Sequence, residues 1–124
     1  GEPGDIVDIV IDPNGRQGMQ SAGTVHHIAF RTANVASQLE IQQILLNNGY
    51  HVTEVKDRNY FKSIYFREPG GVLFEIATDE PGFAIDEDEA HLGELLKLPE
   101  WIEPQRAKLE ARLAKVELNI EKYA

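Results

Sequence analysis

The chain has 124 residues, enough for a single domain with a modest hydrophobic core. Its 12 Lys and Arg against 21 Asp and Glu give a formal charge of −9, which disfavours contact with phosphate backbones and argues against nucleic acid as a partner. The absence of cysteine excludes thiolate metal sites and fits a reducing, cytoplasmic location, and no apolar run approaches the ~18 residues of a membrane span, so no membrane partner is expected.

The first half of the chain predicts a linker, a strand and a helix. Residues 1–23 are rich in glycine and proline around one apolar patch, which predicts a linker with one short strand. β-branched and aromatic residues then predict a strand at residues 24–31. Asn34 is suited to cap a helix over residues 35–47, and Gly49 to end it. One side of this helix is expected to carry its apolar residues, which are Val35, Leu39, Ile41, Ile44 and Leu45.

The second half predicts three more strands and a second helix. Strands are expected at residues 50–55, 61–67 and 72–78, with turns at residues 57–59 and 68–71. The acidic stretch that follows is interpreted as a solvated loop. An amphipathic helix is predicted over residues 103–123, its seam buried either in its own domain or against a partner, and the seam consists of Leu109, Leu113, Val116 and Ile120.

These elements predict an α+β fold built on a βαβββ unit. We divide the chain into a linker at residues 1–23, the βαβββ module at residues 24–83, and an acidic loop with a C-terminal amphipathic helix at residues 84–124. Side chains alternate between the two faces of a strand, so each strand has one apolar face. The other face collects His27, Arg31, Ser63, Tyr65, Arg67 and Glu75.

Two interpretations of this polar face are open. It is either an ordinary solvent-exposed face, on which His27 and Glu75 form a cross-strand pair, or a concave site in which the two residues bind a divalent metal. The second interpretation is favoured by small residues on the same face, Ala29, Ser63 and Ala77, because a pocket needs room.

Two stretches carry a resemblance to a known family. They are residues 26–31, HHIAFR, and residues 57–83, a run that spans two predicted strands and their turn. Both resemble the vicinal-oxygen-chelate superfamily, and within it the C-terminal module of two-module, glyoxalase-like dioxygenases that cleave hydroquinone or catechol rings. The resemblance covers roughly residues 4–115. It implies a mixed sheet that forms a cup around a metal.

The resemblance also implies roles for residues of the polar face. His27 and Glu75 would bind Fe(II), or less often Mn(II), as part of a two-histidine, one-carboxylate triad that leaves room for an aromatic diol and dioxygen. Tyr65 would donate a hydrogen bond to a substrate oxygen as the ring opens. Three further substrate-binding candidates are Arg31, Ser63 and Arg67, although the two arginines could equally form ion pairs at the rim.

Two neighbours of these candidates are interpreted as structural. His26 is expected to point to the face opposite His27, near the helix or at an edge. Arg58, in the turn at residues 57–59, is interpreted as part of a structural turn with a salt bridge.

The chain holds one such module, so one triad ligand is missing. We expect either a C-terminal fragment with an incomplete site, completed by an N-terminal module, or two copies that associate as a homodimer. The predicted function is that of an extradiol-type ring-cleaving dioxygenase module. Two alternatives are a non-catalytic module that sequesters an aromatic or drug-like ligand, and a glyoxalase-type isomerase or thiol transferase on the same scaffold.

Overall fold

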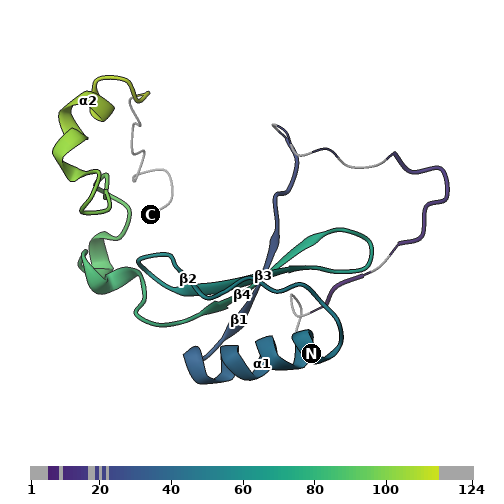
Figure 1. Cartoon of the computed structure of the whole chain (residues 1–124). Helices are drawn as coiled ribbons and strands as arrows, with labels where there is room; N and C mark the ends of the chain where they lie inside the picture. The colour runs from purple at the N-terminus through teal and green to yellow at the C-terminus, as the bar shows by residue number, and fades with distance from the viewer. Residues whose placement is uncertain (1–5, 9, 17–18, 20, 22, 115–124) are drawn as a thin grey trace.

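A four-stranded mixed sheet organises the protein, with one helix against one face (Figure 1). The computed structural model describes residues 6–8, 10–16, 19, 21 and 23–114. The strands are β1 (Ile28–Thr32), β2 (Lys56–Asp57), β3 (Lys62–Arg67) and β4 (Leu73–Thr78). Their order in the sheet is β1-β4-β3-β2, in which β1 runs parallel to β4 while β3 is antiparallel to both β4 and β2. The predicted α+β fold with a mixed sheet is confirmed.

Helix α1 (Val35–Asn47) has the bounds that the sequence predicts. Its N-terminus forms a capping box: Asn34 Oδ1 accepts from the Ser37 amide at 3.0 Å, and Ser37 Oγ accepts from the Asn34 amide at 3.3 Å. The chain leaves the helix through Gly49, whose φ of 82° lies in the left-handed region. Both helix ends are therefore determined by local chemistry.

The buried side of α1 is more polar than predicted. Gln38 is fully buried, and its amide donates to the carbonyls of Lys62 and Ile76, each at 2.8 Å. By contrast Leu39 and Ile44 are 46% and 60% exposed, while Val35, Ile41 and Leu45 are partly buried, so the five apolar residues predicted on one side of the helix do not all face the sheet. The side of the helix that faces the sheet is determined by hydrogen bonds from Gln38 to strand carbonyls. The distribution of apolar residues along the helix does not predict such bonds.

We expect Gln38→Ala to destabilise the fold by about 2–4 kcal/mol, because it removes two hydrogen bonds between the helix and strand carbonyls and opens a cavity at a fully buried position. The measurement is the free energy of unfolding from chemical denaturation. Gln43→Ala is the matched control: this exposed amide bonds Asn47 on the helix surface, and its loss should cost under about 0.5 kcal/mol. Equal losses in the two variants would contradict a structural role for Gln38.

The apolar core lies between α1 and the sheet. Its most buried apolar residues within the described part of the chain are Ile64 and Ile76, which face each other across β3 and β4. Around them, Phe74 makes edge-to-face contacts with Phe30 and Phe66 at centroid distances of 5.1 and 5.7 Å. These residues belong to the predicted apolar face, so the alternation assigned to the strands holds.

Three predicted strands differ from the structure. The one expected at residues 24–31 begins only at Ile28 and ends at Thr32. The strand expected at residues 50–55 is reduced to an isolated bridge between Val52 and Phe66, and β2 begins only at Lys56. In the N-terminal apolar patch, residues 6–8 and 10–11 belong to no strand, and residue 9 lies outside the described residues. β-branched residues favour an extended backbone, but a strand also needs a partner along its length.

The described residues that follow β4 contact the β2–β3 turn through Phe83 and then extend away from the sheet (Figure 1). The acidic stretch contains two 3₁₀ turns, Phe83–Ile85 and Glu89–His91. A third turn, Glu103–Gln105, leads into α2 (Arg106–Glu110), which is shorter than the helix predicted for residues 103–123; residues 115–124 lie outside the described residues. Among the helices described, none is long and apolar enough to cross a membrane.

Candidate active site

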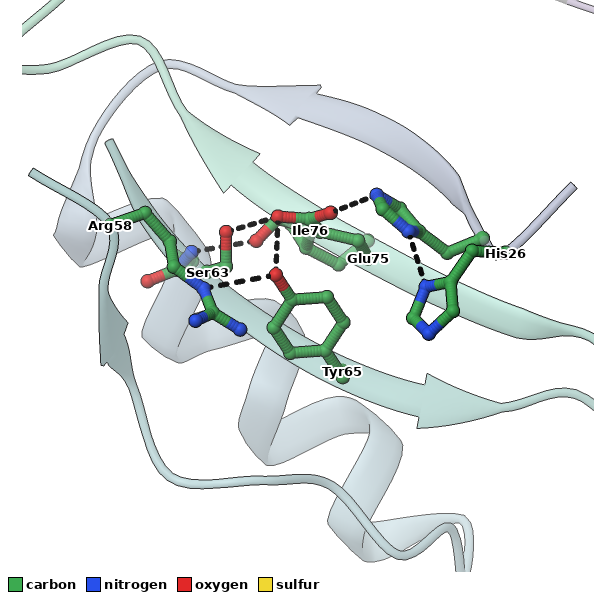
Figure 2. Close-up of polar contacts among 8 residues, drawn as sticks. His26, Arg58, Ser63, Tyr65, Glu75 and Ile76 are labelled. Carbon is green, nitrogen blue, oxygen red and sulfur yellow. Dashed lines mark hydrogen bonds and ion pairs between the residues drawn. The ribbon is translucent and has the colours of Figure 1, made fainter. Parts of the chain in front are cut away.

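Glu75 is a buried carboxylate held from three sides. It lies in β4 and is 3% exposed. Its Oε2 lies 2.7 Å from His27 Nε2, while Oε1 accepts hydrogen bonds from the Tyr65 hydroxyl at 2.9 Å and from the Ser63 hydroxyl (Figure 2). Burying a carboxylate is costly unless its oxygens are paired, and here both are.

Strand register explains why these side chains meet. In the antiparallel β3–β4 pair, Tyr65 lies directly opposite Glu75, and Ser63 is two residues away on the same face. In the parallel β1–β4 pair, Ala29 lies beside Glu75, so the small side chain predicted to make room is next to the carboxylate. Four of the candidates therefore converge, namely His27, Ser63, Tyr65 and Glu75.

His27 is partly exposed and has a second histidine beside it. Its side chain is 36% exposed, and its Nδ1 lies 2.9 Å from Nδ1 of His26, which Figure 2 shows at the end of the cluster. The His27 ring also stands edge-on to Tyr65 at a centroid distance of 6.1 Å. The expectation that His26 points away from His27 is wrong, because both residues precede β1 and strand alternation does not apply to them.

Arg58 is a member of the cluster that the sequence does not reveal. Its guanidinium carbon lies 5.3 Å from the centroid of the Tyr65 ring, and its Nε donates to the Tyr65 hydroxyl at 3.3 Å (Figure 2). The turn that carries it is closed by Asp57 Oδ1, which accepts from the Asn59 amide at 2.8 Å. The turn is as predicted, but among the described residues Arg58 forms no salt bridge and instead contacts Tyr65, because a turn motif does not indicate where its central side chain points.

The other two arginine candidates are bonded elsewhere. Arg31 is 82% exposed and its Nε lies 2.6 Å from Asp79 Oδ1; this hydrogen bond raises the pKa of Arg31 and lowers that of Asp79. Arg67 Nη1 donates to the carbonyl of Gly71 at 2.7 Å, across the β3–β4 turn. The structure does not bring either side chain to Glu75, and their roles toward substrate stay predictions.

His27 and Glu75 have the donor chemistry that a divalent metal requires. An imidazole nitrogen and a carboxylate oxygen converge within 2.7 Å, and the other carboxylate oxygen is fixed by two hydroxyls. Within the described residues, however, no group of three or more metal-ligating side chains lies together. The pair therefore fits part of a metal site rather than a whole one.

Comparison with known proteins settles the family. A family model described as the Glyoxalase/Bleomycin resistance protein/Dioxygenase superfamily matches residues 2–76. The chain belongs to this superfamily. The resemblance noted in the sequence is thereby confirmed. In this member of the superfamily, the matched residues include most of the βαβββ unit and its mixed sheet.

Curated relatives of this superfamily member are longer proteins. Two from Bacillus subtilis strain 168, named "Putative ring-cleaving dioxygenase MhqO" and "MhqE", are each 50% identical to it, over 96% and 86% of the chain but 38% and 34% of their own lengths. The chlorohydroquinone/hydroquinone 1,2-dioxygenase of Sphingobium indicum is 37% identical over 84% of the chain and 33% of its own length. The chain thus spans about a third of these relatives.

A solved structure has the same fold. The crystal structure of a protein from Bacillus subtilis strain 168, titled a "putative dioxygenase", superposes with a TM-score of 0.79 at 53% identity. The superposition covers 86% of the present chain and 34% of the chain in the crystal structure.

Proposed function

We propose that the chain is the metal-binding module of an extradiol-type ring-cleaving dioxygenase that acts on hydroquinone-like or catechol-like diols. Glu75 is the observation that carries the proposal: a buried carboxylate with one oxygen fixed by Ser63 and Tyr65 and the other directed at His27. A solvent-exposed sheet face has no need of such a group. The names of the relatives, which include a hydroquinone dioxygenase, support the same reaction class.

The metal would be held by His27 Nε2 and Glu75 Oε2. Fe(II), or Mn(II), supplies two things when bound there: Lewis-acid stabilisation of a diolate and a site for dioxygen. Ser63 and Tyr65 both bond Oε1 and so hold the carboxylate with Oε2 directed at His27 Nε2, where the metal would bind; orienting a ligand is the usual task of groups around metal ligands.

Tyr65 is the proposed proton donor to substrate. Its oxygen accepts from Arg58 Nε, so its own proton is directed toward Glu75 Oε1, beside the position that an aromatic diol would occupy. A hydrogen bond from this hydroxyl to a substrate oxygen would stabilise the charge that develops during ring opening. Arg58 lies over the Tyr65 ring and holds it in place, so we assign Arg58 as a positioning residue.

A further histidine is needed to complete the triad. We propose that it comes from another module of the same superfamily, or from a second copy of the chain in a homodimer. The greater length of the relatives supports the first source.

Oxygen consumption tests the function. With Fe(II) and the complementing module or second copy present, adding hydroquinone, methylhydroquinone or catechol should consume one dioxygen for each ring opened, measured with an oxygen electrode and by loss of ring absorbance. Binding of the same diols without oxygen uptake would favour a non-catalytic aromatic-binding module. Conversion of a thiol adduct without oxygen would favour a glyoxalase-type isomerase or transferase.

A further inference from the structure

A groove lies beside Tyr65, between the segment at residues 49–53 and the β3–β4 turn. Its volume is about 520 Å³, within the range of sites that take small molecules. Five of its lining side chains matter for the argument: His51, Thr53, Tyr65, Arg67 and Leu73.

The register of the sheet places these five on the same face as Glu75. The Val52–Phe66 bridge sets Thr53 opposite Tyr65, which two hydrogen bonds of 3.0 Å between them support. The same register sets His51 opposite Arg67, and Arg67 lies opposite Leu73 in the β3–β4 pair.

The groove adjoins the proposed metal site through two neighbouring rows of side chains, because Tyr65 and Leu73 line the groove and both neighbour Glu75 in the sheet. The first row runs Thr53, Tyr65, Glu75. The second runs His51, Arg67, Leu73, and Leu73 lies two residues before Glu75 on the same face of β4. The aromatic ring of a diol bound at His27 and Glu75 would therefore lie next to Leu73, and Arg67 would lie on the far side of Leu73.

Arg67 gives the far part of the groove a positive charge. One of its nitrogens bonds the Gly71 carbonyl, and among the described residues no carboxylate lies within ion-pair distance of its guanidinium. The adjacent carboxylate, Glu68, is occupied by the amides of Gly70 and Val72. In a chain of net charge −9, an anion needs such a local cation to bind.

We propose that this groove is the subsite for a ring substituent, and that it selects aromatic diols whose substituent is a carboxylate. Arg67 binds the carboxylate, the His51 imidazole adds a hydrogen bond, and Leu73 contacts the ring. The inference rests on the proposed function for the position of the ring, but binding of the anion requires neither metal nor oxygen.

The test is a titration of the metal-free 124-residue chain, followed by ¹H–¹⁵N NMR, with two probes of similar size: 2,5-dihydroxybenzoate and methylhydroquinone. We expect the carboxylate probe to bind about tenfold more tightly and to shift the amides of Thr53 and Leu73. Arg67→Gln should remove this preference, and Arg67→Lys should keep part of it because the charge remains. Lys108→Gln, which removes a charge in α2, far from the β3–β4 turn that borders the groove (Figure 1), should leave the preference unchanged.

Equal affinities for the two probes, binding of neither, or a preference that survives Arg67→Gln would overturn the subsite. If Arg67 served only the β3–β4 turn, its replacement would weaken both probes alike. Oxygen uptake with neutral hydroquinones but no carboxylate preference would leave the dioxygenase function standing without the subsite. A carboxylate preference without oxygen uptake under any condition would leave the subsite standing without that function.

Discussion

Glu75→Gln is expected to remove stoichiometric metal from the active assembly and to abolish ring cleavage. Glutamine has the size of glutamate and can still accept from Ser63 and Tyr65, but it lacks the negative charge that holds a hard divalent ion. We expect metal affinity to fall by more than about 100-fold, because loss of a group that only hydrogen-bonds a metal ligand already costs about 10–100-fold. Metal content by elemental analysis and oxygen uptake on the same sample measure the two effects.

The matched control is Glu54→Gln. Glu54 is 79% exposed and pairs with Lys56, so its replacement removes one carboxylate without touching the cluster, and metal and turnover should stay as in the parent protein. His27→Ala should lose metal as Glu75→Gln does. If both variants retained stoichiometric metal, the ligands would lie elsewhere and the proposed centre would be wrong.

Tyr65→Phe is expected to slow ring cleavage by about 10²–10⁴-fold while metal content stays the same. The variant keeps the ring beneath Arg58 and loses only the hydroxyl, so a group that donates a proton or hydrogen bond is removed without a change in packing. Turnover number and metal content of the same preparation separate this outcome from loss of the metal.

Tyr60→Phe is the control for Tyr65→Phe. The Tyr60 hydroxyl donates to Asp86 at 3.1 Å, away from the cluster, and its loss should leave turnover within about twofold. A Tyr65→Phe variant with normal turnover would restrict Tyr65 to holding the carboxylate. Loss of metal from the same variant would show that this hydrogen bond maintains the Glu75 ligand.

Local chemistry made much of the fold predictable from the sequence. The bounds of α1 follow from Asn34, Ser37 and Gly49, and the β3–β4 connection follows from turn residues at residues 68–71. Strand alternation then placed Tyr65 and Glu75 on one face, where the structure shows them hydrogen-bonded. Each of these features depends on neighbours in the chain.

Features set by distant contacts were less predictable. Gln38 is buried because it reaches two strand carbonyls, and Leu39 is exposed as a result of the same orientation. Arg58 was assigned to a turn, since nothing in its own segment shows that β3 brings Tyr65 beneath it. The strand predicted at residues 50–55 is likewise shortened, because only Val52 pairs with β3, through its bridge to Phe66.

The position of β1 at the edge of the sheet bears on how the cluster assembles. Ser63, Tyr65 and Glu75 come from two strands joined by one short turn, so they meet as soon as that hairpin forms. His27 arrives only when β1 docks beside β4, which requires closure of a much longer stretch of chain. Edge strands also open locally at lower free energy than central ones. We therefore expect the imidazole to leave the carboxylate by fraying of one strand, without unfolding of the domain.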